Sequence, residues 1–562
     1  MRTVYRILTQ RDMLSRKKTH AMKLSLLKIF LVIVTSAVLI ALCIRWGIPS
    51  TDHPFTYQMD EWHQLMAVRS LLKTGTSNVE GAANGPLGAF LLAVGWLSPW
   101  AAVHLSELSQ LGSPLEHLEL QHNLFIWLRI ETLAASIATL CLAVYFMKRA
   151  SAHSLKGWWY IGFWAFAPLW LVLSNYFKYD IVLTFFLMLA GLSVLSFSRK
   201  PTLKHMCLTA GLIGCAVAIK VSALPLTIPL AYLLVTKIPK QKILLFALYG
   251  LASFLLTVGL FGFPDLLFLG RGEYLSFFYD NIVAVPSYSQ QYLTGHSQFV
   301  YLLGIQFPYQ FGYGFVAFLL ICGATLLHAY ALKKEQRTPV TQDEVLIIIT
   351  LLACVVSLVP LQLMMVGNRW LVLLPWLFMA GYQLWLRVIR TQLYKNNIKI
   401  YRTIVMLCLL IQLLHGVALL STRIEKDPRK ISTELLLQQN IPTVLGMENI
   451  PIYQMIPDVL LYEQYRQQYD KNYTSSFSFA VIDHTTPVLP DDLIITNVLM
   501  GSLVPTTAHA QLIQRLSREG YQIKWQVRPQ FSFHRYFGTE EMFALSGLNA
   551  LPTDITHYSR HN

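Results

Sequence analysis

The sequence predicts an α-helical polytopic membrane protein with about 11 transmembrane helices and a small C-terminal α/β domain on the outer face. Three observations predict this fold. The 562 residues are 54% hydrophobic and 13% charged, which is too apolar for a soluble protein of this length. The apolar residues form runs of membrane-spanning length, with basic clusters between alternate runs. Residues 422–562 then return to a soluble composition.

The apolar runs define the candidate spans, each close to the about 20 residues that a bilayer requires. They cover approximately 26–45, 124–147, 157–175, 181–198, 206–219, 221–236, 243–263, 309–331, 345–366, 370–386 and 403–421. The first run follows a basic tail, residues 1–25, as in a secretory signal. No small-residue cleavage site follows it, so we interpret it as an uncleaved first span.

The basic residues indicate how the chain crosses the membrane. If the N-terminus is cytoplasmic, every basic cluster between spans falls on the same side, as the positive-inside rule requires. These clusters are Lys148, Arg149 and Lys156; Arg199, Lys200 and Lys204; Lys237, Lys240 and Lys242; Lys333, Lys334 and Arg337; and Arg387, Arg390, Lys395, Lys399 and Arg402. The formal net charge of +15 therefore reflects topology, and no nucleic acid is expected as a partner.

This topology divides the chain into a membrane domain, 26–421, and an outer domain, 422–562. Long outer loops cover 46–123 and 264–308. In the first loop, 60–73 and 86–100 resemble helices that lie along the interface. The alternative, a crossing by 86–104, would move every later basic cluster to the outer face. In the second loop, Tyr292 and His296 are candidate substrate-binding residues, although a lone histidine is more often structural.

The outer domain has the pattern of a small α/β or α+β fold. Short strands are expected at 452–455, 477–482, 492–496 and 521–527, and an amphipathic helix at 508–518. The domain contains no cysteine, which fits a bacterial periplasm at least as well as an endoplasmic reticulum lumen.

Three acidic residues stand out on the outer face. Asp60 and Glu61 begin an interfacial segment, where they are candidates for a general base or, alternatively, simple helix-terminal acids worth about 0.3–1 kcal/mol. Asp180 opens the run 181–198, where a carboxylate is costly unless it is paired or functional. A Lys178–Asp180 interfacial pair or a helix cap is its ordinary explanation.

Basic residues that topology does not explain lie near the same face. Arg129 and Arg369 begin spans, and Lys220 separates two short apolar runs. Interface anchoring or snorkelling accounts for each one alone. Together with Lys178 and the acids, they describe a cavity that binds an anionic lipid headgroup and deprotonates a hydroxyl.

No cofactor is indicated by the sequence. There is no glycine-rich phosphate loop, and Gly211 to Gly214 lie inside a span, where close helix packing is the better interpretation. The seven cysteines show neither metal-ligand spacing nor a disulfide framework.

Several short motifs occur in a distinctive order along residues 25–420. Met59-Asp60-Glu61 follows the first span, and Asn84-Gly85-Pro86-Leu87 comes later in the same loop. Leu128-Arg129, Tyr179-Asp180, Ala218-Ile219-Lys220 and Asn368-Arg369-Trp370-Leu371 with Leu374-Pro375 follow. In this order and on this side, they resemble the GT-C superfamily of polyprenyl-phosphate-sugar-dependent glycosyltransferases, especially aminoarabinose transferases and dolichyl-phosphate-mannose protein mannosyltransferases.

The resemblance implies transfer of a sugar from a polyprenyl-phosphate donor to an outer-face hydroxyl of a lipid, glycan or protein. It makes Asp60 the base or acceptor-positioning acid and Asp180 a second acceptor-side or ion-binding acid. Metal dependence varies across this superfamily, so we expect no metal, with a divalent ion as the alternative. Arg129, Lys178, Lys220 and Arg369 become the donor-phosphate set. The aminoarabinose transferases have a lysine before a Pro-Pro pair, whereas this chain has Asn84-Gly85 and one proline. We expect Lys178 to supply that missing charge.

Two other functions remain open at this point. A transporter or flippase of lipid-linked saccharide would also need cations and a lateral cavity, but with ionisable residues deep in spans or interrupted repeats. An oligosaccharide ligase would differ in donor rather than in fold. The expected location is the bacterial inner membrane, with a cytoplasmic N-terminus and a periplasmic outer domain.

Overall fold

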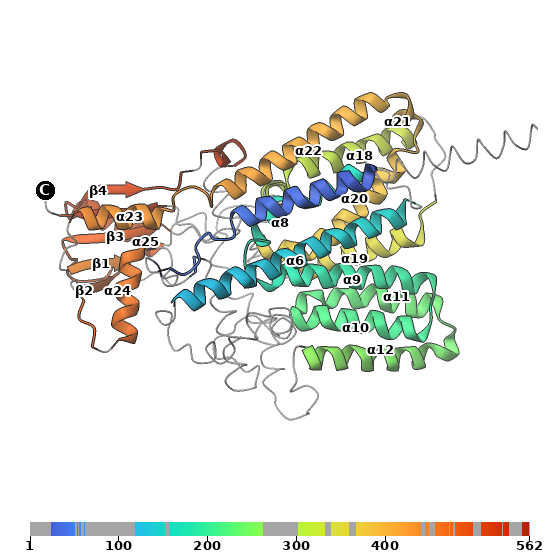
Figure 1. The fold of residues 1–562 in the computed structure, drawn as a ribbon, viewed down its shortest axis with the longest axis horizontal. Helices are drawn as coiled ribbons and strands as arrows, with labels where there is room; N and C mark the ends of the chain where they lie inside the picture. The colour runs from blue at the N-terminus through green and yellow to red at the C-terminus, as the bar shows by residue number, and fades with distance from the viewer. Residues whose placement is uncertain are drawn as a thin grey trace, which may run out of the picture.

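The computed structural model consists of a bundle of apolar helices with a small sheet domain at one end (Figure 1). Its described residues are 24–50, 53, 56, 57, 61, 118–151, 157–261, 302–331, 339–358, 367–439, 444–448, 456–470, 472–475, 478–497, 507–530, 532–538 and 554–560. The predicted interfacial helices, most of both outer loops and the predicted strand 452–455 lie outside these residues.

Six helices among the described residues are long and apolar enough to cross a membrane. They are Leu24–Leu42, α6 (Leu118–Ala150), α9 (Tyr179–Arg199), α12 (Lys240–Phe261), α18 (Tyr313–Ala331) and α22 (Ile398–Ser421). Their most apolar windows have a mean hydropathy of 1.8 to 2.5. The chain is therefore a multi-pass membrane protein.

The other predicted spans are shorter or interrupted helices. Span 157–175 consists of η1 (Trp158–Tyr160), α7 (Ile161–Ala165) and α8 (Pro168–Leu173). Pro168 has no N–H to donate, so the helix breaks before it. The Ser36 hydroxyl of the first helix donates to the Ala165 carbonyl at 2.8 Å, which satisfies one backbone group at the break. Irregular backbone is tolerated at this depth because α7 and α8 are buried in protein.

Two helices pack closely through small residues, as the sequence predicts. α10 (Leu203–Ile219) contacts α12, with Gly211 facing Ser253 and Gly214 facing Phe254 and Thr257. A Cβ atom at Gly214 would lie 2.0 Å from the Thr257 hydroxyl oxygen. The prediction of close helix packing at Gly211 to Gly214 is therefore confirmed.

The remaining predicted spans also combine short elements. The chain leaves α10 through η2 (Val221–Leu226) into α11 (Thr227–Lys237). η4 (Leu302–Gln306) and α17 (Phe307–Phe311) precede α18, and α19 (Gln342–Leu358) follows it. η6 (Gly367–Val372), α20 (Leu374–Val388) and α21 (Gln392–Asn396) lead to α22. Composition identified these apolar stretches, but packing decides where each helix is interrupted.

The described strands of the outer domain form one five-stranded sheet in the order β2-β1-β3-β5-β4. β1 (Val444–Glu448) pairs in parallel with β2 (Ser478–Ile482) and β3 (Asp492–Asn497), whereas β5 (Asp554–Ser559) is antiparallel to β3 and β4 (Gln522–Val527). The helices are α23 (Pro428–Gln438), α24 (Asp458–Tyr469) and α25 (Thr507–Arg518). The sheet and its helices agree with the predicted α/β fold.

Aromatic contacts attach this domain to the helical bundle. The Tyr309 hydroxyl of α17 lies 2.5 Å from Nε2 of His534 in η8 (His534–Tyr536), and both residues are buried. The His415 ring of α22 stacks between Tyr313, with ring centroids 4.5 Å apart, and Phe537, at 5.3 Å. These contacts fix the sheet domain against the ends of α17, α18 and α22 that lie nearest to it.

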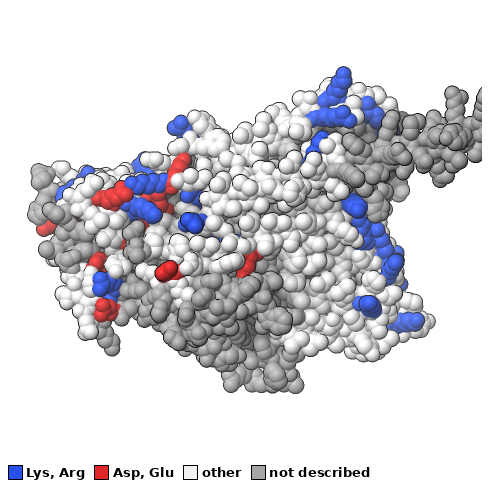
Figure 2. Space-filling model, viewed as in Figure 1, with Lys and Arg blue, Asp and Glu red and all other residues white. Residues whose placement is uncertain are grey.

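Charge is distributed unevenly over the visible face of the molecule. Lys and Arg gather at the end of the bundle remote from the sheet domain, where few acidic residues appear (Figure 2). Near the sheet domain, acidic and basic residues are mixed. The positive-inside rule predicts this uneven distribution of charge for a protein with a cytoplasmic N-terminus. The orientation itself stays a prediction.

Candidate functional site

The segment 174–180, which joins α8 to α9, brings together most of the predicted site residues. All seven of its residues are buried. The Asn175 amide donates to the Ile40 carbonyl at 2.6 Å, and the Ser174 hydroxyl donates to that of Ser136 at 3.2 Å. These bonds to the first helix and to α6 hold the segment in place at the end of the bundle that faces the sheet domain (Figure 1).

Glu61 and Arg129 form a buried ion pair beside this segment. Arg129 Nε lies 2.8 Å from Glu61 Oε1 and Arg129 Nη2 lies 2.7 Å from Oε2, with both side chains fully buried. Arg129 Nη1 donates to the carbonyls of Ile44 and Trp46. The Phe177 N–H donates to Glu61 Oε1 at 2.7 Å. The pair therefore joins three separate parts of the chain: the end of the first span, α6 and segment 174–180.

This geometry bears on two predicted roles. All three guanidinium nitrogens of Arg129 already donate hydrogen bonds to protein groups, and Glu61 already accepts three. A phosphate would have to displace these bonds to reach Arg129. The arrangement favours a structural role for the pair, and the catalytic and phosphate-binding assignments stay predictions.

Asp180 lies between two lysines at the start of α9. Its Oδ1 is 3.1 Å from Lys220 Nζ and its Oδ2 is 3.7 Å from Lys178 Nζ. The Asp180 side chain is 1% exposed and that of Lys220 is 21% exposed, so the lysine remains within reach of a ligand. Lys220 has an extended backbone where α10 gives way to η2, which turns its side chain across to α9. The sequence did not indicate that Lys220 pairs with Asp180.

Arg423 is a further cation at the site that sequence reasoning missed. Its guanidinium carbon lies 4.0 Å from the ring centroid of Tyr176 and 5.1 Å from that of Trp46. Burial lowers the pKa of Arg423 below its ordinary value. One signal was available: Arg423 directly follows the last span, on the face where the positive-inside rule leaves cations unexplained.

A second buried cluster connects the start of the first outer loop to the sheet domain. The Tyr57 hydroxyl donates to Asp458 Oδ2 at 2.8 Å, and the Arg429 guanidinium lies 3.4 Å from the centre of the Tyr57 ring. Arg429 also pairs with Asp427 at 2.8 Å. The pKa of Asp458 is raised to about 7, chiefly by burial and also by the charge of Asp427, while Arg429 and the Tyr57 hydrogen bond lower it.

Other predicted site residues fall partly or wholly outside the described residues. Asp60, Tyr292 and His296 are not described. Arg369 belongs to η6, which contacts α8 and α9, but its side chain is not described. Among the described residues, no group of three or more His, Cys, Asp or Glu side chains is arranged to hold a metal ion.

The described part of the site carries an excess of positive charge. Arg129, Lys178, Lys220 and Arg423 face the two carboxylates of Glu61 and Asp180. Buried cations in excess of acids favour an anionic ligand, and ammonium and guanidinium groups form strong charge-assisted hydrogen bonds with phosphate. Fixed cations of this kind also stabilise charge that develops on a departing oxygen.

One protein-family sequence model matches part of this chain. Residues 80–277 match the sequence model of the dolichyl-phosphate-mannose-protein mannosyltransferases. The matched range contains Arg129, Lys178, Asp180 and Lys220. The resemblance to the GT-C superfamily that the motifs indicated is thereby confirmed for this part of the chain.

Among solved structures, two of the similar chains are those of ArnT from Cupriavidus metallidurans. The form bound to undecaprenyl phosphate has 11% sequence identity and a TM-score of 0.46, with 94% of this chain and 97% of that chain covered. The apo form has 11% identity and a TM-score of 0.45, with 95% and 97% covered. No curated protein sequence matches this chain.

Proposed function

We propose that this protein is an integral-membrane glycosyltransferase that moves a sugar from a polyprenyl-phosphate donor to a hydroxyl acceptor on the outer face. The observation that carries the proposal is the convergence of four cations and two carboxylates around segment 174–180. The match of residues 80–277 to a family of lipid-phosphate-sugar transferases supports it. The acceptor is a lipid, glycan or protein hydroxyl.

The transfer needs a base for the acceptor and cations for the departing phosphate. The acceptor oxygen forms a bond to the anomeric carbon of the sugar as the bond from that carbon to the phosphate oxygen breaks. The acceptor proton passes to Asp60, which we assign as the base. Lys178 and Lys220 bind the lipid phosphate and stabilise the charge that it gains.

Asp180 and the Glu61–Arg129 pair have positioning roles in this proposal. Asp180 holds the two lysine ammonium groups at 3.7 Å and 3.1 Å from its carboxylate oxygens. Arg129 and the Phe177 N–H hold the Glu61 carboxylate, and we assign Glu61 a positioning role for its sequence neighbour Asp60.

The test is product formation by the purified full-length protein with a panel of polyprenyl-phosphate sugars and hydroxyl acceptors. Asp60→Asn is expected to lower kcat by about 10²–10⁴-fold, the usual contribution of a general base. Asp483→Asn in the sheet domain, an exposed acid far along the chain, is the control and should match the parent. Equal turnover by Asp60→Asn would refute the assignment of the base.

Transport is the competing function, and the same assay distinguishes it. A transferase releases free polyprenyl phosphate as the sugar is transferred. A flippase leaves the donor chemically intact and changes only its distribution between the two leaflets of a proteoliposome. Donor movement without donor consumption under every condition would replace the transferase proposal by transport.

A further inference from the structure

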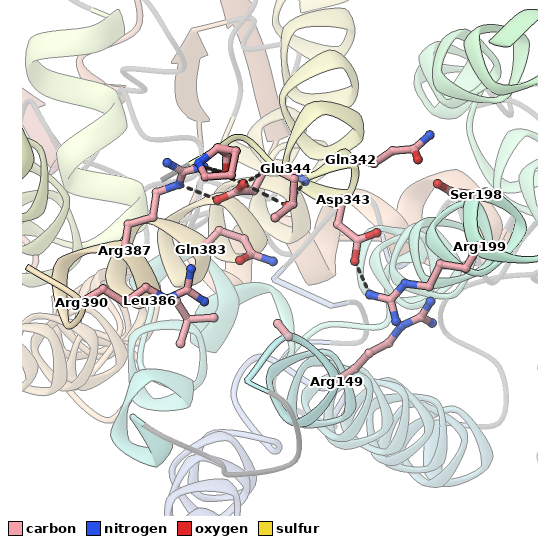
Figure 3. Close-up of a pocket in the computed structure, with 13 residues that line it drawn as sticks. Arg149, Ser198, Arg199, Gln342, Asp343, Glu344, Gln383, Leu386, Arg387 and Arg390 are labelled. Carbon is pink, nitrogen blue, oxygen red and sulfur yellow. Dashed lines mark hydrogen bonds and ion pairs between the residues drawn. The ribbon is translucent and has the colours of Figure 1, made fainter. Parts of the chain in front are cut away.

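A cavity of about 330 Å³ opens at the end of the bundle remote from the sheet domain. The ends of α6 and α9, the start of α19, and the end of α20 with the residues just after it line this cavity. Figure 3 shows Arg149 and Arg199 on one side of this hollow and Arg387 and Arg390 on the other, with Gln383 between them. None of these residues belongs to the site around segment 174–180.

The walls of this cavity carry more positive than negative charge. Its four arginines face two carboxylates, Asp343 and Glu344. Arg199 pairs with Asp343. Arg387 pairs with Glu344 through two hydrogen bonds of 2.6 Å and 2.7 Å. Two arginines are therefore neutralised by acids and two positive charges remain.

The two remaining charges belong to Arg149 and Arg390. Arg149 donates to the Ser196 hydroxyl at 2.8 Å and to the Leu195 carbonyl at 3.1 Å, so neutral groups fix its direction and leave its charge uncompensated. The Arg390 side chain is exposed and makes no hydrogen bond or ion pair with the described residues. A fixed and an uncommitted guanidinium on opposite walls suit an anion bound between them.

Topology alone does not require this arrangement. The positive-inside rule concerns the number of Lys and Arg residues near the membrane surface, and exposed residues such as Lys200 and Lys204 satisfy it. Arg149 and Arg387 are instead half-buried, and their guanidinium groups are held in fixed positions by hydrogen bonds. Several cations from different helices facing one hollow at the membrane surface are typical of a lipid headgroup site.

We propose that this cavity binds the phosphate group of an anionic phospholipid. Guanidinium groups match phosphate oxygens in geometry, and the ends of membrane helices lie at the level of lipid headgroups. The site is separate from the donor site, and the proposal does not depend on the transferase activity. Free phosphate has the same chemistry, so the experiment distinguishes the two sources.

The test measures binding of phosphatidylglycerol to the full-length protein in phosphatidylcholine nanodiscs, by native mass spectrometry and fluorescent-lipid titration. Loss of each cation is expected to weaken binding about fivefold, so Arg149→Gln with Arg390→Gln should weaken it about 25-fold. Arg402→Gln is the matched control because Arg402 lies near the start of α22 and does not line the cavity. Arg390→Gln alone breaks no described contact and tests the site without disturbing the fold.

The outcomes separate the alternatives. The lipid site is supported if the double variant loses phosphatidylglycerol binding, Arg402→Gln retains it, and inorganic phosphate does not displace the lipid. Binding of inorganic phosphate alone, lost in the same double variant, supports the phosphate site but overturns the lipid as its source. Equal binding by the parent and the double variant, or equal loss in Arg402→Gln, overturns the proposal.

Discussion

Arg129 Nη2 lies 2.7 Å from Glu61 Oε2 where neither side chain is exposed to solvent. A buried ion pair of this kind depends on both members, because each charge has left water and only its partner compensates it. Glu61 also accepts a hydrogen bond from the Phe177 N–H. Arg129 also donates hydrogen bonds to the carbonyls of Ile44 and Trp46. The start of the first outer loop, α6 and segment 174–180 therefore depend on one interaction.

Breaking this pair should destabilise the protein strongly. Glu61→Gln leaves the Arg129 charge buried without its partner, which costs about 3–5 kcal/mol in comparable pairs. The measurement is unfolding of the purified protein by denaturant and by heat. Lys426→Gln is the control because it removes an exposed pair with Glu434, whose side chains are 52% and 53% exposed, and such pairs contribute about 0–1 kcal/mol. Equal losses in the two variants would contradict the structural role.

The sequence predicted the acids and cations of the site but not which of them pair. Glu61 and Arg129 are separated by 68 positions, and no local pattern connects residues so far apart. Arg129 was therefore assigned to a phosphate, whereas the fold commits its nitrogens to protein groups. The excess cations and their common face were predictable, because composition and the positive-inside rule depend on residue type and order alone.

In the outer domain too, some strands could be predicted from the sequence and others could not. The strands at 478–482, 492–497 and 522–527 alternate apolar and polar residues or contain apolar runs, and each was expected nearly at its observed position. Neither β1 nor β5 was expected, and in β5 the residues Asp554, Thr556, His557 and Ser559 make the strand polar. It is nonetheless almost wholly buried, since it lies between β3 and β4. Sheet order decides burial there, and the local sequence does not encode that order.

Donor affinity should depend on the lysines around Asp180. Lys178→Ala and Lys220→Gln each remove a cation from the proposed phosphate site, at a cost of about 1.5–3 kcal/mol, or roughly 10–150-fold in donor KM. Lys240→Gln, an exposed residue at the start of α12, is the control and should not change donor KM.

The conservative variant distinguishes phosphate binding from simple pairing with Asp180. Lys178→Arg keeps the charge and should retain most of the donor affinity, whereas Lys178→Ala should not. If Lys178→Ala left donor KM unchanged, Lys178 would not be the replacement for the lysine that this chain lacks before Pro86.

Helix packing at Gly214 should not tolerate a side chain. A Cβ atom there would lie 2.0 Å from the Thr257 hydroxyl oxygen and 2.7 Å from the Phe254 carbonyl oxygen, so α10 and α12 would have to separate. Gly214→Ala should destabilise the protein by about 1–3 kcal/mol, as overpacking does in other cores. The matched control is Gly323→Ala in α18, where nothing lies within 4 Å and alanine favours the helix by up to about 1 kcal/mol. Thermal unfolding in detergent compares the two, and equal stability would contradict the predicted clash.

Attachment of the sheet domain should weaken as the pH rises toward neutrality. Burial raises the pKa of Asp458 from 3.8 to about 7, so between these values the folded protein holds a proton that the unfolded chain has released. Stability falls with pH wherever the folded state binds more protons. The contribution of Asp458 is therefore fully present below about pH 4 and is lost progressively as the pH rises to about 7.

Asp458→Asn should remove this pH dependence. The amide cannot ionise, yet its oxygen still accepts the Tyr57 hydrogen bond, which measures 2.8 Å in the parent. The measurement is the midpoint of thermal unfolding, or the rate of proteolytic release of the sheet domain, between about pH 4 and 8. Tyr57→Phe is the companion variant: it removes the hydroxyl but leaves the buried carboxyl, so the pH dependence should persist at lower overall stability. An identical pH profile in Asp458→Asn and the parent would show that another group titrates there.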